Sequence, residues 1–139
     1  MPQSFYRFYY HIIWSTKQRL PLITPEVESL VANYLPKKII EYGGQQFILN
    51  MVEDHIHLLC SIPPKISVAD FVHNIKGSTS HFINANKGEK DFYWQSGYGA
   101  LTLSEKGLPF VINYIARQKE KHKNNSLIDI LEYIPEYKE

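Results

Sequence analysis

The sequence has few of the features that mark secreted, membrane-spanning or disordered proteins. Its 139 residues include a single cysteine, Cys60, so the chain cannot form an internal disulfide. No apolar run is long enough to cross a membrane, and the N-terminus lacks the basic flank and apolar stretch of a secretion signal. With 44% hydrophobic and 21% charged residues, a disordered tail or fibrous repeat is excluded. We therefore expect one soluble, cytoplasmic domain over residues 1–139.

The chain also has little excess charge, with 15 basic and 14 acidic residues. The charges are nevertheless unevenly distributed. Residues 106–123 carry five basic side chains against one glutamate, whereas residues 124–139 carry one lysine against four acidic side chains. A basic segment before an acidic tail is compatible with a solvated helix face, and it also suits contact with phosphates.

Alternation of apolar residues predicts four strands, at residues 5–14, 45–51, 55–62 and 98–103. The helices between them carry start signals. Thr24-Pro25 begins the first helix, in which Pro36 is expected to cause a kink or a division. Ser67-x-x-Asp70 is a capping box for the second.

The resulting order, β-α-β-β-α-β-α, matches the split βαβ pattern of ferredoxin-like and RRM-like folds. We expect an α+β fold with a four-stranded antiparallel sheet and two helices on one face. A third helix, from Ser104 to Asn124-Asn125, should lie near the other face and complete a core over residues 5–123. A last, acidic helix is expected in residues 126–139, capped by Ser126.

Two histidines form the sharpest local feature. In Asp54-His55-Ile56-His57-Leu58-Leu59, His55 and His57 lie two residues apart on a strand and so point to the same face. Neutral imidazoles bind divalent ions without the mutual repulsion of paired carboxylates, so a metal site is one interpretation. Two surface histidines are the other, and a metal site would need further ligands.

The third predicted helix offers such ligands. Tyr114 and Gln118 lie four residues apart on one side of it, and His122 continues the line. A phenol with a pKa near 10 is a poor nucleophile unless a metal ion polarises its target. Two histidines, a glutamine and a tyrosine could therefore act together on a phosphodiester, although a half-exposed tyrosine and a surface glutamine would fit the same spacing.

Five sequence blocks in this order resemble the HUH single-tyrosine transposases of small insertion sequences and their REP-associated relatives. The blocks are residues 10–17 (YHIIWSTK), 54–59 (DHIHLL), 76–78 (KGS), 94–98 (WQSGY) and 114–118 (YIARQ). Relatives often carry two histidines where this chain has Lys121-His122, so the role of His122 is open.

The resemblance implies a function and a site. Tyr114 would be the nucleophile, and His55, His57 and Gln118 would bind Mg²⁺ or Mn²⁺. The substrate would be single-stranded DNA with hairpin-forming ends, cleaved through a 5′-phosphotyrosine in a prokaryotic cytoplasm. The protein would act as a homodimer in which the tyrosine helix can serve the partner's histidines.

Six basic residues are candidate DNA contacts: Lys17, Arg19, Lys76, Arg117, Lys119 and Lys121. His11 either lines the site or is structural. Three other interpretations remain at this stage: a non-catalytic module that binds single-stranded nucleic acid, a metal hydrolase that uses a bound water, and a domesticated HUH nuclease.

Overall fold

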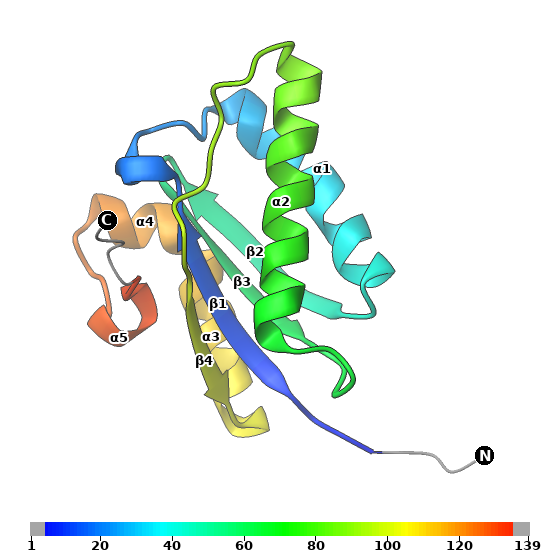
Figure 1. Ribbon diagram of the computed structural model, residues 1–139. Helices are drawn as coiled ribbons and strands as arrows, with labels where there is room; N and C mark the ends of the chain where they lie inside the picture. Colours follow the sequence, from blue (N-terminus) through cyan, green and yellow to red (C-terminus); the bar gives the residue numbers. More distant parts are fainter. Residues whose placement is uncertain (1–4, 135–139) are drawn as a thin grey trace.

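The strands form one antiparallel sheet in the order β2-β3-β1-β4. A computed structural model describes residues 5–134 and shows this sheet as a twisted layer between helices (Figure 1). The strands are β1 (Tyr9–Ser15), β2 (Gln45–Val52), β3 (His55–Ser61) and β4 (Gly99–Leu103). The central strands β1 and β3 each pair with a neighbouring strand on both edges. Side chains in the middle of these two strands are therefore flanked by side chains of two other strands.

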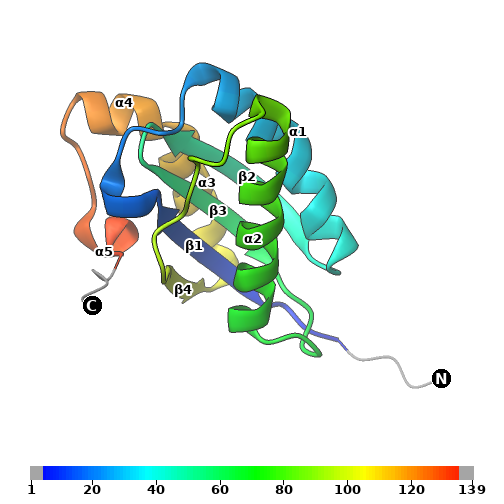
Figure 2. The same ribbon diagram turned by 45° about the horizontal axis from the view of Figure 1, so that its top comes forward.

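Two long helices cover one face of the sheet (Figures 1 and 2). α1 (Pro25–Glu41) and α2 (Val68–Lys87) begin at the predicted caps, Thr24 and Ser67, whose side chains accept hydrogen bonds from backbone amides three residues further on. The main core lies between these helices and the sheet. Its buried strand residues are Ile12, Trp14, Met51, Ile56, Leu58 and Cys60. The predicted α+β fold is therefore confirmed.

The opposite face of the sheet carries a smaller layer. α3 (Leu108–Ala116) and α4 (Gln118–Lys123) lie on it, after a 3-10 turn, η2 (Glu105–Gly107). The buried residues of this second apolar cluster are Leu59, Val111 and Ile115. The predicted placement of the segment after the last strand is correct.

The third predicted helix is interrupted, which corrects the expectation of one continuous helix. Arg117 has φ −103° and ψ 23° and separates α3 from α4. Asn50 of β2 donates its side-chain amide to the carbonyls of Ile115 (2.9 Å) and Ala116 (3.2 Å). Because the sheet supplies these hydrogen bonds, α3 can end where local periodicity would continue it.

Pro36 does not divide the first helix, which runs unbroken from Pro25 to Glu41. A proline inside a helix costs about 3 kcal/mol through a lost hydrogen bond and a clash. Val31, Leu35 and Ile39 are fully buried on both sides of it. Packing of these side chains against the sheet outweighs the local cost.

The last helix is shorter than predicted. α5 spans only Asp129–Glu132 and starts after Ile128 without a side-chain cap, so the proposed cap at Ser126 is wrong. Residues 135–139 lie outside the described residues. Within residues 5–134 no helix is both long and apolar enough to cross a bilayer.

Candidate active site

His55 and His57 project from β3 toward the layer of α3 and α4, on the face opposite the main core. Ile56 and Leu58 point into that core, as strand alternation requires. Only 3% of His55 and none of His57 is exposed. Both histidines are therefore interior groups, and the interpretation of them as plain surface residues is wrong.

Each of these imidazoles has a partner on its Nδ1 atom. His55 Nδ1 lies 2.7 Å from Asp54 Oδ1, and His57 Nδ1 lies 2.8 Å from His11 Nε2. Bonds of this kind fix the orientation and tautomer of a histidine. They leave the two Nε2 atoms facing the same space.

Tyr114, Gln118 and His122 reach that space from α3 and α4. Tyr114 is 2% exposed and Gln118 is fully buried. The Gln118 amide lies between its neighbours, with Oε1 3.0 Å from His122 Nε2 and Nε2 3.4 Å from the Tyr114 carbonyl. The break at Arg117 is small enough to keep the three side chains on one side, as the four-residue spacing predicted.

Glu132 of α5 completes the cluster, and the sequence analysis missed it. Its Oε1 lies 3.2 Å from His55 Nε2, 3.1 Å from His57 Nε2 and 3.3 Å from His122 Nε2. Its Oε2 accepts hydrogen bonds from the Tyr114 hydroxyl and from Gln118 Nε2. In the sequence Glu132 is one of four acidic residues of the tail, and no local pattern distinguishes it from the others.

The hydrogen bond between Glu132 and Tyr114 favours the ionised carboxylate and the neutral phenol. Burial alone would raise the pKa of Glu132, but hydrogen bonds from His55, His57 and Tyr114 lower it far below its usual value. Burial raises the pKa of Tyr114 to about 12, and the bond to Glu132 adds to this effect. The tyrosine is therefore held as a neutral phenol that donates to an ionised carboxylate.

The cluster has the chemistry of a metal site. Single ligand atoms of His55, His57, His122 and Glu132 all lie within 4.8 Å of one another. Ligands about 2.1 Å from one ion are themselves about 3.0 to 3.4 Å apart at the usual coordination angles. The 3.1 to 3.3 Å separations between Glu132 and the three imidazoles match that spacing. The residues fit a divalent ion with nitrogen and oxygen ligands.

The six predicted DNA contacts do not all face this cluster. Lys121 Nζ lies 6.0 Å from the centre of the Tyr114 ring, and Arg19 is near enough to Asp54 to help lower its pKa. Lys76 belongs to α2 on the other face, where its ammonium donates to the carbonyls of Gln95 and Gly97. Its cationic group is thus engaged within the protein.

The other three basic residues also have protein partners. Arg117 pairs with Glu120, and Lys119 pairs with Glu28. Lys17 Nζ lies 5.7 Å from the centre of the Tyr93 ring. Lys119 also donates to Asn50 Oδ1 and to the Met51 carbonyl, each at 3.0 Å. The contacts of Arg117 and Lys17 are exposed and therefore weak.

One chain brings all the site residues together. The Tyr114 and His57 rings have centroids 6.1 Å apart, and both belong to the same molecule. The second apolar cluster holds α3 on its own sheet. A site shared between two chains would require α3 to leave that position.

Comparison with known proteins agrees with this architecture. The family model described as "Transposase IS200 like" matches residues 4–118. The ISDra2 transposase TnpA of Deinococcus radiodurans is 28% identical over 122 residues, covering 84% of this chain and 87% of the relative. The transposase for insertion sequence element IS200 of Salmonella typhimurium is 30% identical over 128 residues, covering 87% of this chain and 83% of the relative.

Two solved structures have the same fold. A crystal structure from Deinococcus radiodurans R1, described as that of a transposase, superposes with a TM-score of 0.67 at 25% identity, covering 85% of this chain and 96% of the other. A REP-associated tyrosine transposase bound to a REP hairpin superposes with a TM-score of 0.63 at 15% identity, covering 88% and 74%.

Proposed function

The chain belongs to the family of IS200-like transposases, and from this premise we propose that it cleaves and rejoins single-stranded DNA at insertion-sequence ends through a 5′-phosphotyrosine on Tyr114. The supporting observation is the buried hydroxyl of Tyr114, which shares Glu132 with His55 and His57. A tyrosine that served only for packing would not require its hydroxyl to meet a carboxylate that is shared with two histidines.

The proposed metal ligands are His55, His57 and Gln118, with Glu132 and His122 within reach as further donors. Mg²⁺ or Mn²⁺ would bind there, and imidazole ligands favour Mn²⁺. When bound, the ion neutralises the charge of a phosphodiester and makes its phosphorus easier to attack. The carboxylate of Glu132 adds a negative charge that the ligand set expected from the sequence lacked.

In the proposed reaction Tyr114 Oη forms a bond to phosphorus while the bond from phosphorus to the 3′ oxygen breaks. The products are a 5′-phosphotyrosine and a free 3′-hydroxyl, whose oxygen takes a proton from water as it leaves. Glu132 Oε2 already accepts the phenol hydrogen bond, so it is the atom placed to take the proton as the new bond makes the phenol acidic. One phosphodiester replaces another, so the step is reversible and needs no nucleotide cofactor.

The proposed substrate is single-stranded DNA whose ends fold into hairpins. A structural relative is bound to a REP hairpin, which supports this class of ligand. Lys121 and Arg19 are predicted phosphate contacts that lie close to the cluster. The test is to incubate the protein and Mn²⁺ with labelled single strands from the DNA that flanks its coding sequence. A transposase forms a covalent adduct, a hydrolase cuts without one, and a binding module does neither.

We expect metal binding to weaken as the pH falls. Burial lowers the pKa of His55, but hydrogen bonds to Asp54 and Glu132 outweigh burial and raise it above 6.5. Because only neutral imidazole binds an ion, protons compete at His55 at a higher pH than at a free histidine. Calorimetry should show the Kd for Mn²⁺ rising from about pH 8 to about pH 6. The Asp54→Asn variant should shift this rise to lower pH, and a Kd that does not change with pH would contradict the prediction.

We also propose a homodimer, because moving a DNA segment requires two ends to be cut and each chain offers one such tyrosine. Light scattering should give twice the chain mass. Mixed dimers of His55→Ala and Tyr114→Phe chains should stay inactive, since the structure pairs each tyrosine with its own histidines. Recovery of cleavage in the mixture would instead show that α3 serves the partner chain, as the family resemblance implies.

A further inference from the structure

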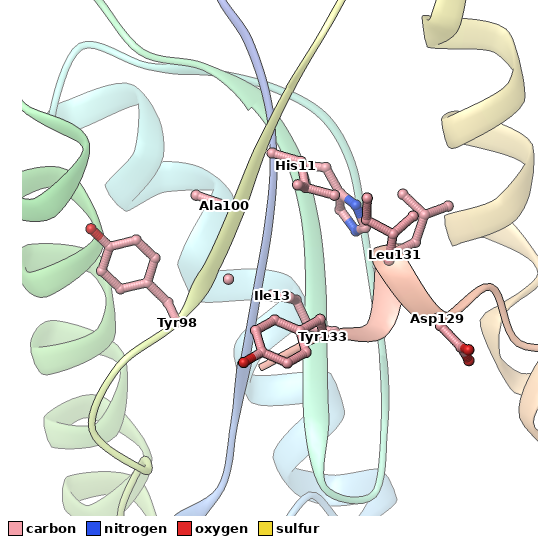
Figure 3. A pocket seen from close by; sticks show the side chains of 10 residues that line it. His11, Ile13, Tyr98, Ala100, Asp129, Leu131 and Tyr133 are labelled. Atoms are coloured by element: carbon pink, nitrogen blue, oxygen red, sulfur yellow. The ribbon is translucent and has the colours of Figure 1, made fainter. Parts of the chain in front are cut away.

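A cavity of about 500 Å³ lies beside the catalytic cluster, between α5 and the sheet (Figure 3). Ile13 of β1 and Leu101 of β4 form its floor, and Leu131 and Tyr133 form the wall from the α5 side. Tyr98 and Ala100 also border it but project to the other side of β4. Gly99 allows the wall to approach, because a side chain there would clash with the Tyr133 carbonyl.

His11 contributes a polar atom that nothing in the described chain satisfies. The residue is 1% exposed and its ring lines the cavity beside Leu131. Its Nε2 bonds to His57, but its Nδ1 is buried with no hydrogen-bond partner within residues 5–134. Leaving such an atom unpaired costs about 1 to 3 kcal/mol, so a ligand in the cavity that bonds to it would recover this free energy.

The lining selects the kind of ligand. It is apolar except for His11, the carboxylate of Asp129 and the hydroxyls of Tyr98 and Tyr133, and no lysine or arginine of residues 5–134 lines it. The described lining therefore offers a phosphate no cation. A flat ring with one polar edge fits better, since Tyr133 is 68% exposed and can stack on a ring while His11 bonds to its edge.

Only the His57 side chain lies between His11, which lines the cavity, and the carboxylate that the Tyr114 hydroxyl contacts. The His11 and His57 rings are stacked with centroids 5.0 Å apart, and His57 Nε2 contacts the same carboxylate as the Tyr114 hydroxyl. A nucleotide with its phosphate at Tyr114 would therefore have its base close to this cavity.

We propose that the cavity binds the base next to the scissile phosphodiester, with Tyr133 stacking on it and His11 Nδ1 reading its edge. The inference rests on the proposed function. If His57 binds an ion through Nε2, its Nδ1 carries a proton and donates to His11 Nε2. His11 Nδ1 is then a donor, so the preferred base presents an acceptor, such as a carbonyl oxygen of a pyrimidine or O6 of guanine.

The test measures binding of single-stranded oligonucleotides by fluorescence anisotropy in Mn²⁺, with Tyr114→Phe as the common background so that cleavage does not interfere. The probes come from the DNA that flanks the coding sequence, with each nucleotide in turn made abasic. One abasic position, adjacent to the phosphodiester that the wild type cuts, should weaken binding by the Tyr114→Phe chain by about 10-fold or more. When Tyr133→Ala or His11→Gln is added, the same abasic change should have little further effect, whereas added Tyr133→Phe should leave the abasic penalty unchanged.

The control variants separate this role from a merely structural one. His11→Gln can still accept a hydrogen bond from His57 Nδ1, and its measured Mn²⁺ affinity reports any effect on His57 separately from the loss of base preference. An abasic penalty that persists in both variants, or that no single position shows, would overturn the proposal. Failure of the proposed function has a separate readout, the absence of a covalent adduct with wild-type protein.

Discussion

Tyr114→Phe is expected to abolish the covalent protein–DNA adduct, with a loss of at least about 10³-fold in cleavage rate. The substitution removes the proposed nucleophilic oxygen and keeps the ring that packs beside His57. No other hydroxyl donates to Glu132 in the described residues, so no neighbour can substitute for it. Denaturing gels with labelled single strands and Mn²⁺ measure the adduct directly.

The same variant has a structural cost that must be separated from the chemical one. The Tyr114 hydroxyl also accepts a hydrogen bond from the Ile128 amide at 3.0 Å. Its removal leaves that amide without this partner and should lower the free energy of unfolding by about 1 to 3 kcal/mol. Urea unfolding checks this value, and Tyr133→Phe is the matched control, since it removes a phenol next to the site without touching the nucleophile. An adduct that survives in Tyr114→Phe would show that another residue attacks DNA.

His57→Ala should eliminate both metal binding and cleavage. His57 is fully buried between His11 and Glu132, so no other side chain can move into its place. Loss of one of the few protein ligands should raise the Kd for Mn²⁺ by about 100-fold or more, as changes around metal sites commonly cost 10- to 100-fold even beyond the ligands themselves. Mn²⁺ electron paramagnetic resonance measures the bound ion without any need for DNA.

His73→Ala is the control for this effect. His73 is an exposed residue of α2, on the face of the sheet away from the cluster. It should bind Mn²⁺ and cleave DNA as the wild type does, and EDTA should stop cleavage in both. Circular dichroism confirms that the His57→Ala chain is folded. Metal binding at wild-type affinity in folded His57→Ala would place the ion elsewhere.

Many features of the fold and of the candidate site could be predicted from the sequence. Strand alternation placed His55 and His57 on one face and Cys60 on the other, and helix caps located the starts of α1 and α2. These features depend on neighbours within four residues, for which backbone geometry is nearly constant. The four-residue spacing of Tyr114 and Gln118 also led to the correct side of the helix layer, even across the break at Arg117.

Tertiary structure decided the rest. The side chain of Asn50 on β2 ends α3, and the packing of α1 keeps Pro36 within a continuous helix; both effects come from residues distant in sequence. The insertion of Glu132 among three histidines and a tyrosine follows from how the loop after α4 returns over the sheet, and no sequence period encodes that return. Local sequence determined which residues could carry chemistry. Long-range packing decided that the carboxylate of Glu132 joins them, because the position of a short helix such as α5 depends on the surface against which it packs.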